Sequence, residues 1–448
     1  MDLIKTYPAS THGDVFMARD QSGRDVLVRD GKPHALDHEA ACWLRERFPF
    51  TAPSPVLGCD RTFGVGDRLG IAAPGHIRVF NAYDAVPVLV QQSVRELRLT
   101  GRSWEDILDC VTFMAFREGY TGGFGADGDH LKQKKDIADV LALGFTMVTL
   151  DCSDHIRKDD GEDRLPDELA NLYLGKAIDL GGGQSIALSR AELAAAYNIY
   201  GEAVEFAASV WDEFFADGCA RADFEMSIDE TELPTTPAQH FFVAAELQRR
   251  GVRLATMAPR FCGEFQKGID YIGDKAQFER EIITHAAIAR HFGYKLSIHS
   301  GSDKFSVFPL IGKHTQGRFH VKTAGTNWLE AMRIVAEHDP ALYRRAHAFA
   351  AQHVEEARKY YHVKLDMAQV PDLAGLKDHE LPALFDMEDP RQLIHITYGL
   401  ILSDPGLHGA LYSFWDTRAD AYAAALEKHI GKHLSMLGVT KIQGGELK

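Results

Sequence analysis

The chain of 448 residues lacks several features that would assign it to particular classes of protein. Its cysteines form no Cys-x-x-Cys pair, which argues against a disulfide framework and against a thiolate zinc site. No apolar run is long enough to span a bilayer, and the first residues lack the basic and then apolar pattern of a secretion signal. We therefore expect a cytoplasmic protein with reduced thiols. The cysteines are Cys42, Cys59, Cys110, Cys152, Cys219 and Cys262.

An excess of basic charge is also lacking. The formal net charge is −15 at pH 7, which disfavours nonspecific binding to nucleic acid or to anionic lipid, although a local basic patch could still bind a small anion. The segment Phe63–Gly70 contains a Gly-x-Gly, but no third glycine opens a helix at the spacing of a dinucleotide fingerprint. We expect a small-molecule substrate and no nucleic-acid or membrane partner. A homo-oligomer is left open.

Helices and short apolar strands alternate from about residue 103 onward. Helix starts are indicated by capping residues, of which Ser189 and Thr236 have a Glu or Gln three residues later. Short apolar strands between helices are typical of a parallel sheet covered on both faces, and five of them favour a TIM-like (β/α) barrel. The other expected caps are Ser103, Asp274 and Thr326, and the expected strands are Phe145–Leu150, Phe224–Ile228, Arg253–Met257, Leu296–Ile298 and Phe319–Val321.

Three regions follow from this pattern. Residues 1–100 are rich in Gly, Pro and Asp and are expected to pack on the barrel or contribute to it. Residues 101–338 are expected to form the main barrel. Residues 339–448 are expected to form a helical C-terminal extension packed on the barrel, because 340–362, 390–402 and 415–437 have a helical pattern.

Three histidines lie at or near the ends of expected strands. His155 follows Phe145–Leu150, His299 follows Leu296–Ile298, and His320 lies in Phe319–Val321. Active sites of α/β barrels form where the strands end, and three histidines with one open position are a common catalytic metal site. We expect these histidines to bind one divalent metal ion, although for any single histidine an ordinary hydrogen-bonded role is more common. Zinc is the first choice, and nickel, cobalt or manganese would also suit imidazole.

Acidic and basic side chains near the strand ends could take part in acid–base chemistry or in substrate binding. Asp154 could be a general base, a further metal ligand or a helix cap. The loop after Arg253–Met257 carries Glu264 as a possible acid or base, and Arg260 and Lys267 as possible anion ligands, although a solvated loop would look similar. Lys322 could suggest a Schiff-base aldolase, which we consider less favoured.

The run Gly122–Lys132 contains two acids, a histidine and a lysine after several glycines. It does not match a calcium-binding EF-hand loop, because the distal Glu is missing and the spacing differs. Such a loop could contact a polyhydroxylated substrate or could simply lead into a helix. The full set of expected substrate-binding residues is Asp127, Asp129, His130, Lys132, Arg260, Gln266, Ser300, Asp303 and Lys322.

Three of these segments together resemble the tagaturonate epimerase family, and the resemblance spans nearly the whole chain. They are Gly66–His76, Gly125–Lys132 and Ile298–Lys304. The resemblance implies a metal-dependent barrel enzyme that interconverts D-tagaturonate and D-fructuronate, and in some relatives D-tagatose and D-fructose. It implies that Asp154 is the proton acceptor, that Glu264 is the proton donor, and that the three histidines named above are the metal ligands.

The implied chemistry places constraints on the site. The inverted carbon, C4 of the ketose, is not adjacent to the ketone, so simple enolisation cannot invert it. Retro-aldol cleavage, rotation of the aldehyde fragment and re-addition would invert it, with a base and an acid on opposite faces. A metal-dependent aldolase or isomerase on the same fold is the alternative, and a non-catalytic sugar-acid binding protein is a more distant one. A uronate would also need a cation, which Arg260, Lys132 or Lys322 could supply.

Overall fold

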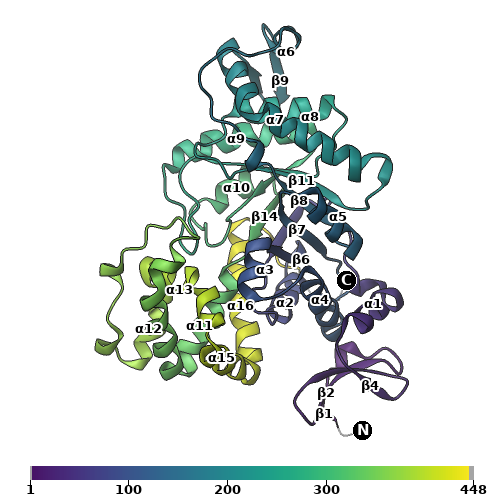
Figure 1. Cartoon of the computed structure of the whole chain (residues 1–448), viewed down its shortest axis with the longest axis vertical. Helices are drawn as coiled ribbons and strands as arrows, with labels where there is room; N and C mark the ends of the chain where they lie inside the picture. The colour runs from purple at the N-terminus through teal and green to yellow at the C-terminus, as the bar shows by residue number, and fades with distance from the viewer. Residues whose placement is uncertain (1–2, 443–448) are drawn as a thin grey trace.

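The barrel expected from the sequence is present. The computed structural model describes residues 3–442, and gives Asp217 and Thr326 by their backbone alone. Within residues 3–442, eight parallel strands close into a barrel surrounded by helices (Figure 1). The fold is thus a TIM-like α/β barrel. The strands are β5 (Arg61–Val65), β6 (Val86–Ser93), β7 (Gly125–Leu131), β8 (Met147–Asp151), β11 (Asp223–Ile228), β12 (Thr256–Pro259), β13 (Lys295–Ile298) and β14 (Phe319–Thr323).

Four helices around the barrel begin at the capping residues expected from the sequence, whereas α11 (Thr326–His338) has Gly325 as its N-cap instead of the expected Thr326. The side chains of Ser103, Ser189 and Thr236 each accept a hydrogen bond from the backbone N–H three residues later, and each is part of a reciprocal capping box. Asp274 caps α9 in a similar way. The helices of this region are α2 (Ala73–Ala82), α3 (Val94–Thr100), α4 (Trp104–Glu118), α5 (Lys134–Leu143), α7 (Arg190–Phe214), α8 (Pro237–Arg249), α9 (Lys275–Phe292), α10 (Phe308–His314) and α11 (Thr326–His338).

The limits of the barrel differ from the expected 101–338. The strands β5 and β6 lie within the first hundred residues, so the barrel strands extend from Arg61 to Thr323. The strand β7 occupies the glycine-rich run that also read as a loop, and β12 begins three residues later than expected. Strand β6 was not among the expected strands either, although it begins with an apolar run. Both strands β5 and β7 contain glycine and polar residues, so neither has the apolar pattern by which the expected strands were recognised.

Smaller elements lie outside the barrel (Figure 1). An antiparallel sheet and α1 precede it, and a two-stranded hairpin and α6 project beyond α7. No helix within residues 3–442 combines the length and the apolar character needed to cross a membrane. These elements are β1 (Leu3–Thr6), β2 (Phe16–Asp20), β3 (Asp25–Arg29), β4 (Lys32–His34), α1 (His38–Arg47), α6 (Asp167–Tyr173), β9 (Ala177–Gly181) and β10 (Gln184–Ala187).

The C-terminal helices form a second hydrophobic core beside the barrel. Trp328 of α11 and Trp415 of α15 are buried in it, and their indole N–H groups donate to the carbonyls of Ile394 and Ala331. The last helix, α16, returns to pack against α2 of the barrel. The helices of this part are α12 (Pro340–Ala357), α13 (Glu388–Ile396), α14 (Tyr398–Ser403), α15 (Pro405–Thr417) and α16 (Ala419–Met436).

The inside of the barrel is unusually polar. TIM barrels are ordinarily filled with branched apolar side chains. Here the Thr149 hydroxyl donates to Asp127 and is within hydrogen-bond distance of Glu225, and Lys322 also contacts this group. Closer to the other end of the barrel, Thr62 bonds His320 and Lys295. A polar interior directly below the strand ends indicates that the barrel supports a reactive site at its mouth.

Candidate active site

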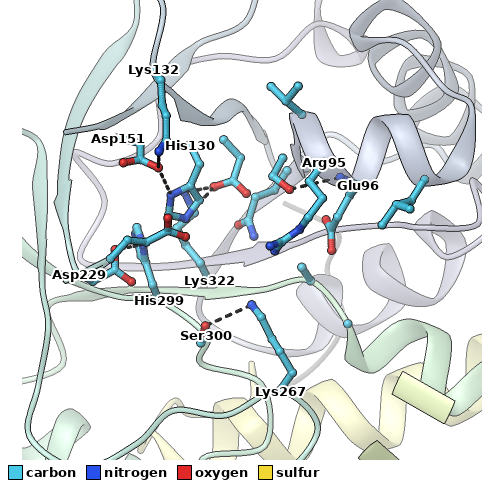
Figure 2. A pocket seen from close by; sticks show the side chains of 18 of the residues that line it. Arg95, Glu96, His130, Lys132, Asp151, Asp229, Lys267, His299, Ser300 and Lys322 are labelled. Atoms are coloured by element: carbon cyan, nitrogen blue, oxygen red, sulfur yellow. Dashed lines mark hydrogen bonds and ion pairs between the residues drawn. The ribbon is translucent and has the colours of Figure 1, made fainter. Parts of the chain in front are cut away.

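A large cavity lies at the carboxyl ends of the barrel strands. Its volume is about 710 Å³, and side chains from the ends of several strands line it. Among them are Asp129 and His130 on β7, Asp151 on β8, and Lys322 on β14. The close-up in Figure 2 shows His130, Asp229 and His299 gathered on one side of this cavity. This is the end of a barrel at which catalytic groups are found.

Two histidines and one aspartate form a group that could bind a metal ion. His130, Asp229 and His299 each offer a ligand atom, and these atoms lie within 4.8 Å of one another. The His130 and His299 rings meet edge to face with centroids 5.0 Å apart. The buried Nδ1 of His130 has no hydrogen-bond partner in the described part of the chain. Two imidazoles and a carboxylate are ligands that suit zinc and related divalent ions.

His299 is held by a carboxylate on each side of its ring. Its Nε2 lies 2.8 Å from Glu225 Oε1, and its Nδ1 lies 3.1 Å from Asp229 Oδ1. Burial alone would lower the pKa of His299, but Asp229 and Glu225 raise it to about 10. The carboxylates thus favour a positive charge at this position, which a proton on His299 or a metal ion could supply. If a metal bound Nδ1, Glu225 would hold the opposite nitrogen, as carboxylates commonly do around metal-bound histidine.

Lys322 is surrounded by carboxylates below the cavity. Its Nζ lies 2.6 Å from Asp127, 2.5 Å from Asp129 and 3.3 Å from Glu225. Burial would lower the pKa of Lys322, but these three carboxylates raise it far above its usual value. For Asp127, burial is the larger effect and raises its pKa to about 6. Lys322 therefore stays charged and is fixed in place by its three partners.

A second group of acids lies beside His130. Asp151 Oδ2 is 3.6 Å from His130 Nδ1 and 3.8 Å from Lys132 Nζ. Burial would raise the pKa of Asp151, but the nearby charge of His130 and the hydrogen bond from the backbone N–H of Ser153 lower it. Glu230 is exposed and lies close enough to His130 and Asp151 to complete another possible ligand set. Asp151 and Glu230 both line the cavity, so either could exchange a proton with a bound molecule.

The structure does not bring the three expected metal ligands together. In the described part of the chain, the groups with metal-ligand spacing include His299 but neither His155 nor His320. His155 lies in a short 3-10 helix beyond β8 and stacks on Phe206 at 4.1 Å. His320 is paired in register with Ser297, two residues below His299, which places it about 7 Å deeper in the barrel. Of the three expected ligands, only His299 belongs to a group with metal-ligand spacing, and the other members of that group are His130 and Asp229.

The pKa of His320 is shifted in the opposite direction from that of His299. Its Nδ1 is 3.0 Å from the hydroxyl of Thr62, and burial lowers its pKa to about 3. It is a neutral interior histidine.

The two expected acid–base residues have different surroundings. The carboxylate of Asp154 accepts a hydrogen bond from Lys132 at 2.9 Å and is more than half exposed, and Asp154 does not line the large cavity. Glu264 lines a neighbouring cavity of about 420 Å³ and accepts a hydrogen bond from Gln266. The two cavities share several residues, among them His299. Glu264 thus faces the site from its other side, whereas Asp154 does not face it.

Eight of the nine expected substrate-binding residues lie in or below the two cavities. Asp129, His130, Lys132, Ser300 and Lys322 line the large cavity. Arg260 and Gln266 line the neighbouring cavity, and Ser300 lines both. Asp127 lies beneath the cavity as a partner of Lys322.

Asp303 has a structural role instead of facing either cavity. Its carboxylate is buried and lies 2.6 Å from Arg391 and 2.7 Å from His429, both on C-terminal helices. Its backbone N–H also donates to His433 at 2.9 Å. Asp303 therefore ties the loop that carries His299 to the C-terminal helices.

Two important residues were not expected from the sequence. Asp229 directly follows β11, and this position after an expected strand was the signal that could have identified it. Burial would raise the pKa of Asp229, but His299 holds it well below its usual value. Glu225 gave no such signal, because it lies in the middle of the strand and faces the barrel interior.

Comparisons with known proteins show which family has the same sequence pattern and fold. A family model described as tagaturonate epimerase matches residues 9–437. The chain is 43% identical, over 464 aligned positions, to the tagaturonate/fructuronate epimerase of Thermotoga maritima, with 97% of this chain and 96% of that protein covered. The glycerol-bound crystal structure of the fructuronate-tagaturonate epimerase of Cohnella laeviribosi has a TM-score of 0.93 and 46% identity, with 97% of each chain covered. Its native crystal structure has the same TM-score and identity, with coverage of 97% and 96%. The likeness extends over the barrel and over the C-terminal helices.

Proposed function

The chain belongs to the tagaturonate epimerase family, and we propose that it interconverts D-tagaturonate and D-fructuronate in the cavity at the mouth of its barrel. The observation that carries this proposal is the group His130, Asp229 and His299 at the strand ends, together with the match over nearly the whole chain. The reaction rearranges one molecule without a second substrate, so the enzyme is an isomerase.

We further propose that a divalent metal ion binds His130, Asp229 and His299. The donor set fits: two imidazoles and a carboxylate converge, and the carboxylates around His299 favour a positive charge. The alternative set with His130, Asp151 and Glu230 is less suitable, because Glu230 is exposed. A bound ion would supply Lewis-acid stabilisation of negative charge that develops on the ketone oxygen. Zinc is our first choice, followed by nickel, cobalt or manganese.

The residues of the chain can carry out the proton transfers of a retro-aldol route. A base removes the proton of the C4 hydroxyl, the C3–C4 bond breaks, and its electrons move to the ketone side as an enediolate. The aldehyde rotates, the C–C bond forms again on its other face, and an acid returns the proton to the new alkoxide. We assign the acceptor to Asp151, which lines the cavity, in place of Asp154. Glu264, on the other side of His299, remains our choice of donor.

Lys322 complements these groups by electrostatics. It stays protonated beside the cavity, so it offsets the negative charge of Asp127, Asp129 and Glu225 without itself giving up a proton. Thr149 and the buried carboxylates hold its Nζ in place, so Lys322 and these acids form one fixed group below the possible metal ligands.

Product analysis by ¹³C NMR tests the proposed function. Purified protein, loaded with zinc or manganese, is incubated with D-fructuronate, and we expect the signals of its C4 epimer to appear. Release of three-carbon fragments would instead indicate an aldolase. The variants His130→Ala, Asp229→Asn and His299→Ala should lose bound metal and turnover together, whereas His155→Ala should keep both. Full metal content and full turnover in the first three variants would refute the metal assignment.

A further inference from the structure

The cavity at the barrel mouth has two ends of opposite charge. Carboxylates and the histidines occupy one end, and two cationic side chains, Arg95 and Lys267, occupy the other (Figure 2). Both cations also line the neighbouring cavity, so they lie where the two cavities meet. A molecule bound in the cavity would therefore contact the possible metal ligands at one end and two positively charged side chains at the other.

Lys267 is a partly buried cation without a carboxylate partner. Its Nζ donates to the hydroxyl of Ser300 at 3.1 Å, and no ion pair of Lys267 occurs within residues 3–442. Burial lowers the pKa of Lys267, and the nearby guanidinium groups of Arg95 and Arg68 lower it further against the opposing effect of Glu96. Burying a charge without a partner is costly, so such a lysine is suited to receive an anion.

Arg95 reinforces this positive end. Its guanidinium lies 4.9 Å from the ring centre of Tyr361, and its Nη1 donates to the carbonyl of Tyr360 at 3.5 Å. Within the described chain it too forms no ion pair.

The nearby carboxylate of Glu96 does not neutralise this end. Arg68 lies 2.6 Å from Glu96 Oε1, and both side chains of this pair are buried. The opposite charges of Arg68 and Glu96 cancel within this pair. The positive charges of Lys267 and Arg95 are therefore not neutralised by Glu96.

Two other cations of the cavity are already occupied, and a third, Arg98, is exposed to solvent. Lys322 is bound by three carboxylates. Lys132 donates to Ser153 and Asp154. Neither lysine is available to bind a further anion without breaking existing ion pairs. We therefore do not expect Lys132 or Lys322 to bind the substrate carboxylate, although the sequence had suggested both.

We propose that Lys267, assisted by Arg95 and by the hydroxyl of Ser300, binds the carboxylate of the sugar-acid substrate. This inference rests on the proposed function and adds the orientation of the substrate: the carboxylate lies at Lys267, and the ketone lies at His130, Asp229 and His299. It also makes Lys267 the residue that selects uronates over neutral ketohexoses, because tagatose and fructose carry a hydroxyl where the uronates carry a charge.

Binding of a charged and an uncharged sugar derivative tests this assignment. D-Gluconate and D-glucitol differ in the same way as a uronate and a ketohexose, and calorimetry measures their affinities without need of turnover. In the metal-loaded wild type, gluconate should bind more tightly than glucitol. Lys267→Met should weaken gluconate binding and raise KM for fructuronate by about 10- to 100-fold, because a charged hydrogen-bonded pair is lost. Its glucitol affinity and its kcat should change little.

Matched variants separate this role from a structural one. Lys267→Arg keeps the charge and should restore most of the gluconate affinity. Lys135→Met removes an exposed lysine of α5 and should behave as wild type. The inference is overturned if Lys267→Met weakens gluconate and glucitol equally, or weakens neither. A wild type that binds gluconate selectively but does not convert fructuronate would refute the proposed function while supporting the carboxylate site.

Discussion

Replacement of Lys322 by methionine should destabilise the barrel strongly, because this residue neutralises a buried acidic cluster. Its side chain is 4% exposed and lies within 3.3 Å of Asp127, Asp129 and Glu225. Removing one partner of a buried ion pair costs about 3–5 kcal/mol. With an unfolding entropy of about 2.1 cal/mol/K per residue, the melting temperature of a chain of this length should fall by about 3 to 5 °C.

The pH dependence gives this prediction a second, independent measurement. Without Lys322, one of the buried carboxylates takes up a proton in the folded state, so its folded pKa lies above its unfolded value. The stability linked to that proton is present at low pH and is lost as pH rises through the folded pKa. The difference in melting temperature between wild type and Lys322→Met should therefore shrink from about pH 8 to about pH 5.

Thermal unfolding followed by circular dichroism measures both effects. The double variant Lys322→Met with Asp127→Asn should recover part of the loss, because Asp127 is fully buried and pairs with Lys322 at 2.6 Å. If the single variant melts within about 1 °C of wild type at neutral pH and shows no change on acidification, Lys322 does not stabilise the barrel by neutralising the buried carboxylates.

Three further predictions follow from other contacts. Asp303→Asn should leave Arg391 buried without its partner and lower the melting temperature by about 3 to 5 °C; unchanged melting and unchanged protease resistance of the C-terminal helices would contradict this. Burial lowers the pKa of Lys295 to about 7, so in the unfolded chain this lysine binds a proton more tightly, and wild-type stability should rise with pH above that value. The rise should be weaker in Lys295→Met, and equal slopes in chemical denaturation would exclude the effect. Glu225→Gln should weaken metal binding by about 10- to 100-fold through its contact with His299, as measured by competition with a chelator, and an unchanged affinity would argue against that role.

Those parts of the fold that depend on neighbouring residues could be predicted from the sequence. The box formed by Ser189 and Glu192 and the cap at Thr236 marked the starts of α7 and α8 correctly, because a cap is a contact between residues three positions apart. The apolar strands β8, β11, β13 and β14 were also recognised, and with them the barrel class. These signals are local, so no knowledge of the tertiary structure was needed.

The strands β5, β6 and β7 were missed, and for β5 and β7 the reason is that the interior of this barrel departs from the usual apolar pattern. A side chain at Gly64 of β5 would collide with the amide of Gln91, so the strand needs glycine at a position where strands usually carry a larger residue. In β7, Asp127 and Asp129 face Lys322. A buried strand can carry Asp127 and Asp129 because Lys322 on β14 pairs with both of them.

The candidate site could also be predicted only in part, because residues that are distant in the sequence form it. The sequence placed His299 near a strand end, and that residue lies in the cavity. His155 and His320 were grouped with it by their distance from expected strand ends, but the register sets His320 lower in the barrel and the chain carries His155 beyond β8. His130 was assigned to the substrate because β7 read as a loop. Which side chains meet in the cavity depends on the register between strands, and a single sequence does not reveal that register.

The position of the metal ion decides whether His130, Asp229 and His299 are its ligands. Crystals of the wild type soaked with zinc or cobalt, measured at the absorption edge of the metal, should show a strong anomalous peak between His130, Asp229 and His299. A peak at His155 or His320, or one confined to the cluster of Asp303, His429 and His433 with none at the barrel mouth, would contradict the account.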